Sequence, residues 1–371
     1  MKIITKIKLL TLLALCLFTT VGFGQSTNKM RVLAYYAGGP DELDSYDVNQ
    51  MTHIIFCFGH LEGNRFKVRS AQDSATIRKM VSLKKKNPQL KVIVSLGGWG
   101  GCEPCSDVFS TKKGRQEFAQ SIKELHQHFG TDGLDLDWEY PAVEGYPGHK
   151  FTPADKQNFT KLVKTLRKLD SKYELSFAAG GFKEFLEKAV EWKKVMHQVD
   201  YVNLMTYDLI NGYSKVTGHH TGLYSTPNQE NSTDFAVNYL INLGIPREQL
   251  IVGAAFYGRM FQNVENVNNG LNQPGKFKSG VDFKDFTTQL PADSGYVSFW
   301  DETAKAPYLY NSAKKLFFTY DDKRSIEIKT KYVLDNKLGG IMFWQLASDT
   351  YTDGLLQTIH NVKSSYPTAT K

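Results

Sequence analysis

The sequence has few cysteines, and its cysteines and histidines lack the paired spacing of a zinc site. Cys57 lies in an apolar run and is expected in the core. Cys102 and Cys105 form a C-x-x-C pair in a polar loop, where a local disulfide is the preferred interpretation and free thiols are the alternative. We predict no bound metal and no cofactor, and we interpret His219 and His220 as loop residues.

Long apolar runs are also missing beyond the N-terminus. Residues 1–24 carry three lysines, then the apolar run 9–18, then small residues, which is the plan of a secretory signal peptide. The run is shorter than the roughly twenty residues that span a bilayer, and the bulky Leu15 argues against lipid attachment at Cys16. We predict a secreted protein, extracellular or periplasmic, whose mature chain 25–371 has no membrane partner.

No long basic block occurs, although the formal net charge is +7. That charge falls to +4 once the three lysines of the predicted signal are removed. Nucleic acid is therefore not an expected partner, and we expect a monomer.

Eight short runs rich in β-forming residues recur along the chain. Several are separated by segments of helical periodicity, such as residues 118–129, 159–169 and 235–241. Thr152 and Ser232 are the predicted caps of two of these helices. The eight runs span residues 32–36, 53–58, 92–96, 133–138, 175–179, 201–206, 251–256 and 340–344.

Alternating strands and helices predict a parallel sheet. Eight apolar strands favour closure into a TIM (β/α)8 barrel, an α/β fold, with an open doubly wound sheet as the alternative. The alternation breaks at residues 260–322, which are rich in Asn, Gly, Asp and aromatics. We predict that this segment is a small α+β subdomain inserted between strands 7 and 8 of one large domain.

Three acids alternate with apolar residues in the fourth run, at Asp135, Asp137 and Glu139. Residues two apart in a strand point to the same side, so these side chains line one face. Neighbouring carboxylates raise at least one pKa of the group, which keeps an acid protonated near neutral pH. The pattern therefore predicts a proton donor, Glu139, at the C-terminal end of the strand. The alternative is a calcium site or a solvated acidic face.

The pattern Asp132-x-x-Asp135-x-Asp137-x-Glu139 resembles the fourth barrel strand of the family 18 glycoside hydrolases. Further matching stretches are residues 95–98 (SLGG), 205–208 (MTYD), 257–259 (YGR) and 344–345 (WQ). Residues 299–302 (FWDE), 307–308 (PY) and 320–322 (YDD) resemble the insertion domain of bacterial-type chitinases.

The resemblance implies hydrolysis of β-1,4-linked N-acetylglucosamine polymers with retention, in which the acetamido oxygen of the substrate is the nucleophile. Glu139 is then the acid and base, Asp137 stabilises the oxazolinium ion, and Asp135 holds or shares the proton. Tyr207 orients the acetamido group and Asp208 lies near the reacting sugar. Both can face inward only if the strand curls at its end.

The resemblance also implies a substrate-binding set with Trp344 as the floor for the scissile sugar. Its other members are Tyr35, Ser95, Met205, Tyr257 and Arg259, with Trp99 and Tyr140 as outer sugar platforms. Three alternatives stay open: an endo-β-N-acetylglucosaminidase acting on glycoproteins, a chitin-binding protein without activity, and an ordinary glycosidase with a carboxylate nucleophile such as Asp208. The chitin polymer or its oligosaccharides are the expected partners.

Overall fold

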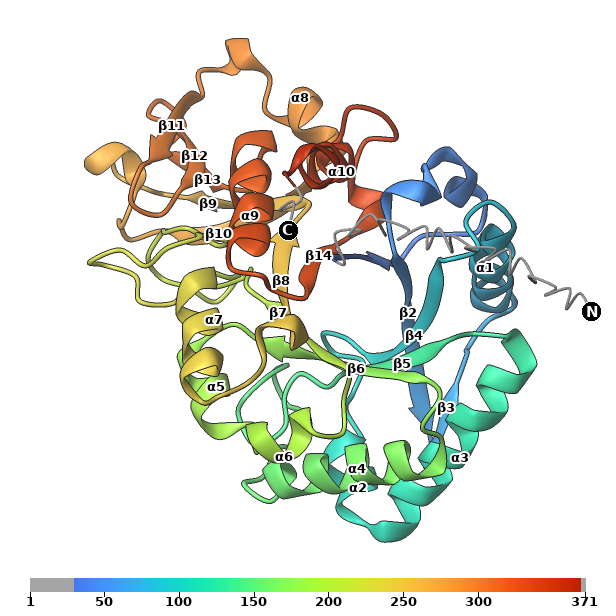
Figure 1. Ribbon diagram of the computed structural model, residues 1–371. Coiled ribbons are helices and arrows are strands. Elements are labelled where there is room, and N and C mark those ends of the chain that lie inside the picture. Colours follow the sequence, from blue (N-terminus) through green and yellow to red (C-terminus); the bar gives the residue numbers. More distant parts are fainter. Residues whose placement is uncertain (1–29, 368–371) are drawn as a thin grey trace, which may run out of the picture. The chain divides into compact units, whose positions relative to one another are not determined.

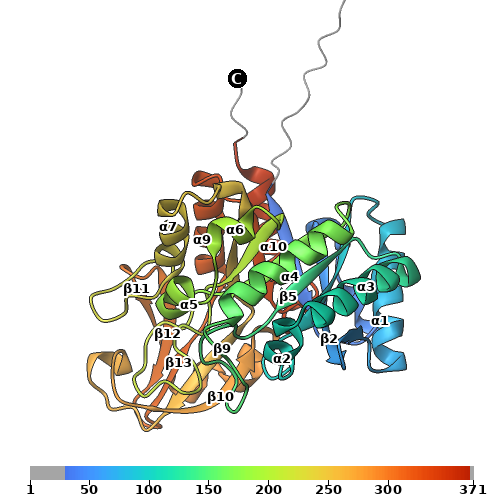
Figure 2. The same ribbon diagram turned by 90° about the horizontal axis from the view of Figure 1, so that it is seen from below.

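The computed structural model describes residues 30–367, so the predicted signal peptide lies outside the described part of the chain. Two sheets organise this part. One is a ring of parallel strands and the other is a five-stranded antiparallel sheet beside it (Figures 1 and 2). No helix within residues 30–367 has both the length and the apolarity to cross a membrane.

The ring is a closed barrel of eight parallel strands, which confirms the predicted fold class. Hydrogen bonding runs in the order β1-β14-β8-β7-β6-β5-β4-β2, and the pairing of β1 with β2 closes it. The antiparallel strand β3 (Arg65–Lys67) extends β2 at one edge. The barrel strands are β1 (Arg31–Tyr36), β2 (His53–Glu62), β4 (Lys91–Gly97), β5 (Gly133–Asp137), β6 (Glu174–Gly180), β7 (Tyr201–Met205), β8 (Leu250–Ala255) and β14 (Gly340–Trp344).

Helices surround the barrel on its outside (Figure 1). A large apolar cluster fills the layer between strands and helices, whereas a smaller cluster of inward-facing residues fills the barrel itself. The helices are α1 (Ala71–Ser82), α2 (Cys105–Ser110), α3 (Lys112–Phe129), α4 (Asp155–Leu169), α5 (Lys183–Lys188), α6 (Trp192–Met196), α7 (Thr233–Asn242), α9 (Lys323–Asp335) and α10 (Leu355–Ser365).

The two predicted helix caps have different outcomes. The Ser232 side chain accepts from the Phe235 N–H and caps α7 as predicted. The prediction for Thr152 is wrong, because α4 begins at Asp155 and has no side-chain cap. The Asp155 carboxylate instead accepts from the Thr152 N–H at 2.7 Å, which turns the chain before the helix begins.

The second sheet lies between β8 and β14 in the sequence. Its order is β10-β9-β13-β12-β11, and two apolar clusters of its own cover its faces. A single residue, Phe256, separates β8 from β9, so the insertion starts directly at the C-terminal end of a barrel strand. Its elements are β9 (Tyr257–Gln262), β10 (Lys276–Asp282), α8 (Phe286–Gln289), β11 (Val297–Asp301), β12 (Ala306–Asn311) and β13 (Leu316–Thr319).

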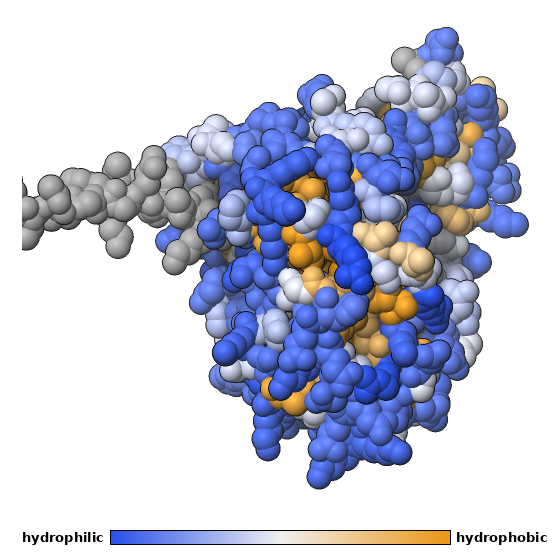
Figure 3. Space-filling view, turned by 90° about the vertical axis from the view of Figure 1, so that its right-hand side faces the viewer, coloured by the Kyte–Doolittle hydropathy of each residue, from blue (hydrophilic) through white to orange (hydrophobic). Residues whose placement is uncertain are grey.

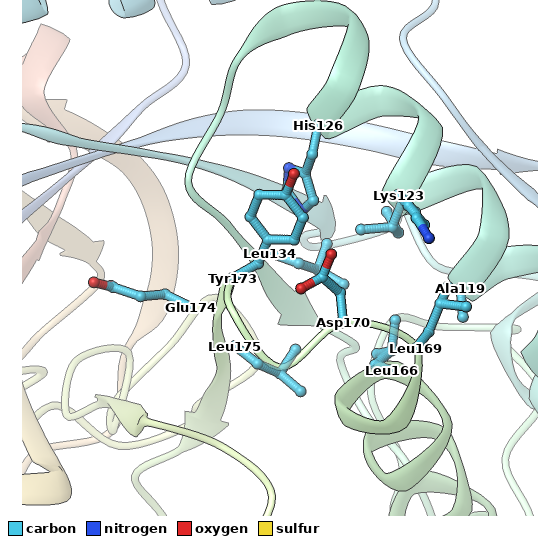
Figure 4. Close-up of a pocket in the computed structure, with 11 residues that line it drawn as sticks. Ala119, Lys123, His126, Leu134, Leu166, Leu169, Asp170, Tyr173, Glu174 and Leu175 are labelled. Atoms are coloured by element: carbon cyan, nitrogen blue, oxygen red, sulfur yellow. The ribbon is translucent and has the colours of Figure 1, made fainter.

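A small apolar crevice of about 30 Å³ lies between α3, α4 and the first residues of β5 and β6 (Figure 4). In it the His126 ring lies 4.1 Å from the Tyr173 ring, and burial lowers the pKa of this histidine to about 4. The crevice is at the opposite end of the strands from the predicted acid. The face that carries α1 is mostly hydrophilic, with apolar side chains gathered near its middle (Figure 3).

Candidate active site

The acidic residues of β5 follow the predicted alternation. Asp135 and Asp137 are buried and face the barrel interior, and Glu139 comes two residues after the strand ends. Leu134 and Leu136, together with Trp138 after the strand, belong to the outer apolar cluster under the helices. The alternation of side chains along the strand thus separates a polar inner column from an apolar outer one.

Asp135 at the base of the column accepts hydrogen bonds from four side chains. Tyr35 Oη and Ser95 Oγ donate to Oδ2 at 3.0 and 2.8 Å. Ser176 Oγ and Asn203 Nδ2 donate to Oδ1 at 2.7 and 3.1 Å. Burial raises the pKa of Asp135, and these hydrogen bonds oppose the rise. With both oxygens occupied by donors, Asp135 is held as an acceptor, which is the state of an ionised carboxylate.

Two residues of the predicted substrate-binding set, Tyr35 and Ser95, contact Asp135. Ser95 is fully buried and Tyr35 is nearly so, and both hydroxyl groups donate to Asp135. Their membership of the substrate pocket stays a prediction, while β1 and β4 here supply them as donors to the interior carboxylate. Their geometry fits a positioning role beneath the site.

Asp137 has the opposite environment. It is buried, and its Oδ1 atom has no hydrogen-bond partner within the described residues. Burial, and then the charges of Glu139 and Asp135, raise the pKa of Asp137 well above its usual range. Asp137 therefore holds a proton more readily than Asp135 does.

Glu139 has a pKa raised to about 7. Burial is the largest cause, the charge of Asp208 adds to it, and a hydrogen bond from Tyr140 opposes it. The sequence argument gave neighbouring charges as the cause, whereas desolvation contributes more. An acid with this pKa is partly protonated at neutral pH and can donate a proton there.

The chain curls at the end of β7, as the inward placement of two adjacent residues requires. β7 ends at Met205, and Asp208 adopts the left-handed backbone region with φ 55°. Tyr207 packs against the interior cluster, and its ring lies 6.2 Å from that of Tyr257.

Asp208 is held by a bidentate ion pair with Arg259. Arg259 Nε and Nη2 donate to the two carboxylate oxygens at 2.7 and 2.5 Å. His220 Nδ1 lies 3.6 Å from Asp208 Oδ1. Burial raises the pKa of Asp208, but His220 and Arg259 outweigh it and hold that pKa well below its usual range. His220 is fully buried and belongs to the surroundings of the site, which the interpretation as a loop residue did not anticipate.

Aromatic rings from several strands gather at the same end of the barrel. Trp344 stacks on Phe58 with ring centroids 5.6 Å apart, and it lies 6.2 Å from the Tyr35 ring. Tyr140, Tyr207, Met205 and Trp344 all contact the interior cluster. Trp99 is 49% exposed, and its ring lies 6.4 Å from that of Tyr140. The structure thus brings Trp344 and Trp99 to the mouth of the barrel beside the acids.

A sequence model described as "Glycosyl hydrolases family 18" matches residues 24–349. The chain belongs to this family.

This family 18 hydrolase covers different shares of two curated relatives. It is 36% identical to chitinase A1 of Niallia circulans over 74% of the chain and 43% of that protein. It is 28% identical to chitinase B of Serratia marcescens over 84% of the chain and 75% of that protein. The chain therefore spans less than half the length of the first relative.

Solved structures show the same likeness. A family 18 N-acetylglucosaminidase from Paenibacillus barengoltzii superposes with a TM-score of 0.81 at 35% identity, over 90% of the chain and 99% of that structure. Chitinase ChiA74 from Bacillus thuringiensis superposes with a TM-score of 0.84 at 27% identity, over 92% of the chain and 71% of that structure.

The family 18 site contains residues that sequence reasoning missed. Asn203 and Ser176 donate to Asp135, and Phe58 stacks on Trp344. Asn203 had a detectable signal, because it is a polar residue at an inward position of an otherwise apolar strand. Asp132, in contrast, lies directly before β5, where its carboxylate accepts from the Val92 N–H at 2.7 Å.

The loop after β4 carries a disulfide between Cys102 and Cys105, as preferred from their spacing. Cys57 is a free thiol that packs against the interior cluster. Within residues 30–367, no group of three or more His, Cys, Asp or Glu side chains has the arrangement of a metal site.

Proposed function

We propose that this protein hydrolyses β-1,4-N-acetylglucosamine linkages in chitin and chitooligosaccharides, with retention and with help from the substrate's acetamido group. The observation that carries the proposal is the inward column of Asp135, Asp137 and Glu139, in which the outermost acid has a pKa raised to about 7. Glu139 would protonate the glycosidic oxygen and then accept a proton from the incoming water.

The environment of Asp208 argues against an ordinary carboxylate nucleophile. Both of its oxygens accept hydrogen bonds from Arg259, which holds the carboxylate in place and lowers its basicity. An attacking carboxylate would have to give up this ion pair as its charge is lost. The substrate's acetamido oxygen needs no such rearrangement, and it is the nucleophile that family membership supports.

Asp137 is suited to stabilise the oxazolinium ion by accepting a hydrogen bond from its N–H. Its Oδ1 atom has no partner inside the described chain, so it is available to the substrate's acetamido N–H. Asp135, with four donors already in place, would help to control the proton on Asp137 without moving. Tyr207 would orient the acetamido oxygen from the end of β7.

The share of each relative that the chain spans favours a second candidate, cleavage from chain ends instead of internal cleavage. The chain spans 99% of the N-acetylglucosaminidase from Paenibacillus barengoltzii but 43% of chitinase A1. Release of single N-acetylglucosamine units from chain ends is therefore the alternative to internal cleavage. We further propose that the protein is secreted, because residues 1–24 have the plan of a signal peptide.

Digestion of chitohexaose and of an N-glycosylated protein by the wild type and by Glu139→Gln tests the proposal. We expect wild type to cleave chitohexaose, to give β-anomers first by proton NMR, and to spare substrate that is deacetylated at the scissile position. Loss of a positioned general acid should lower kcat about 10²- to 10⁴-fold with the fold retained. Exposed Glu144 lies on the same loop, so Glu144→Gln is the matched control.

Two results would contradict the proposal. Rapid cleavage of the deacetylated linkage would exclude the acetamido group as nucleophile. Unchanged turnover of Glu139→Gln would exclude Glu139 as the acid. Cleavage of the glycoprotein alone would favour the endo-β-N-acetylglucosaminidase, and binding without cleavage would favour a chitin-binding protein.

A further inference from the structure

A cavity of about 400 Å³ lies on the insertion, outside the catalytic centre. Its walls come from four segments that are apart in the sequence: His219, the turn at residues 226–228, the loop at residues 268–272, and the hairpin that joins β11 to β12. This volume is within the range of about 300–1,000 Å³ that is usual for small-molecule sites.

The cavity presents hydrogen-bonding side chains that have no partner within the described part of the chain. Asn228, Asn272 and Thr303 line three of these walls, and their side chains, of which Asn228 and Thr303 are exposed, make no hydrogen bond within residues 30–367. Trp300 adds aromatic surface, although the Arg324 guanidinium lies over its ring at 3.7 Å, whereas Tyr308 is buried by stacking on neighbouring phenylalanines. Amide and hydroxyl groups beside aromatic rings can hydrogen-bond the polar edges of a sugar and contact its apolar faces.

The charges around the cavity are already paired. Asp301 Oδ2 lies 2.9 Å from His219 Nε2, and Oδ1 accepts backbone N–H groups of the following turn. Glu302 pairs with Lys305 at 2.8 Å and with Arg324 at 3.2 Å. A ligand therefore meets neutral donors and acceptors rather than a free charge, which favours an uncharged polar ligand over an ion.

The cavity is separate from the acidic column. Arg259 is on β9, whereas Trp300 is on β11, three places away in the order β9-β13-β12-β11. At a strand spacing of about 4.8 Å, this separation is roughly 14 Å. A ligand in the cavity would leave the catalytic centre open.

We propose that this cavity is a second carbohydrate-binding site, which takes one end of a chitooligosaccharide or a neighbouring chitin chain. The inference rests on the proposed function for the choice of N-acetylglucosamine units as the ligand. Its role is to hold substrate on the insertion while the barrel acts on another segment.

Fluorine NMR of 5-fluorotryptophan-labelled Glu139→Gln, titrated with chitotriose, tests the two sites separately. The chain has five tryptophans, so each signal can be assigned by single Trp→Phe variants. Trp344 reports on the barrel mouth and Trp300 reports on the cavity. We expect both signals to shift and saturate, each with its own Kd.

Adding Asn228→Ala and Thr303→Val removes two hydrogen-bonding groups from exposed positions. The Kd at Trp300 should rise about tenfold, while the Kd at Trp344 stays unchanged. Asn361→Ala on α10 is the control and should change neither value.

Each other outcome overturns the inference in a recognisable way. A shift at Trp344 without one at Trp300 would remove the second site and leave the proposed function intact. A Trp300 shift that the double variant does not weaken would be an indirect effect of barrel binding. The absence of both shifts would contradict the second site and the proposed function together.

Discussion

The three carboxyl groups of the inner column differ in how many hydrogen-bond donors they have. Asp135 has four donors, whereas within residues 30–367 one oxygen of Asp137 has none, and Glu139 follows the C-terminal end of the strand. A buried carboxylate without donors is costly, so protons stay preferentially on the outer two groups. The same residue type thus serves as a fixed anion at the base and as an acid at the top.

The pKa of Glu139 predicts a falling basic limb of activity. The acid must be protonated, so kcat/KM should decrease as pH rises through about 7. The negative charge of Asp208 favours protonated Glu139, and Asp208→Asn also leaves the charge of Arg259 unbalanced. Both effects lower the pKa of Glu139, so the basic limb should move to lower pH in this variant.

Profiles of kcat/KM against pH, with chitotriose between pH 4 and pH 10, measure the shift. The test is the pH at which activity falls in Asp208→Asn, not how much lower its maximal rate is. Asp44→Asn removes an exposed carboxylate that pairs with two lysines on the protein surface and is the matched control. A basic limb that stays in place in Asp208→Asn would show that Asp208 does not act on the titrating acid.

Alternation within one strand is enough to predict which of its side chains face inward. Contacts between side chains of different strands could not be predicted, because they depend on how the strands pair. Asp135, Asp137 and Glu139 follow from alternation in β5 alone. The partners of Asp135 come from β1, β4, β6 and β7, so their convergence depends on barrel register. The hydrogen bonds of Tyr35 and Ser95 to Asp135 could not be predicted without that register.

At the scale of elements, the loop after β7 is fixed by a buried ion pair between α9 and the segment that precedes it. Lys329 and Asp321 are both fully buried and lie 2.6 Å apart. Lys329 Nζ also donates to the backbone and side-chain oxygens of Thr221, and Asp321 accepts from the Ala255 N–H. The pair therefore connects α9 and β8 to the segment that follows His220.

Lys329→Met should destabilise the protein by about 3–5 kcal/mol, because Asp321 is left buried without its partner. Urea unfolding followed by circular dichroism measures the loss. The control is Lys331→Met on the same helix, which removes an exposed pair with Glu327 and should cost less than about 0.5 kcal/mol. Equal effects of the two changes would show that burial of the first pair carries no special cost.

The elements themselves were largely predictable, and their ends were not. The eight runs of β-forming residues correspond to the eight barrel strands, since a strand buried on both faces is apolar throughout. Thr152 was chosen as a cap by residue type, yet the Asp155 side chain takes its N–H and delays α4. The strands of the insertion were not resolved from the sequence, because their antiparallel pairing joins segments that lie apart in the chain.

The whole molecule keeps its chemistry at one end of the barrel. The crevice at the N-terminal ends of β5 and β6 is small and apolar, whereas acids, an arginine and aromatic rings gather at the C-terminal ends. This division is the rule for parallel barrels, in which loops after the strands carry the reaction. The insertion leaves from the same end, so it can add binding surface without disturbing the strands.

Net charge gives a prediction for the molecule as a whole. The chain carries a formal charge of +7, and chitooligosaccharides are uncharged, so long-range steering cannot speed their encounter. The kcat/KM for chitotetraose should change less than about twofold between low salt and 0.5 M NaCl, although screening shortens the range of the protein's field to a few ångströms. Parallel assays in sucrose separate ionic effects from those of water activity. A steep fall with salt would show that the preferred substrate is an anionic glycan, because a positive protein attracts such a ligand chiefly through the field that salt removes.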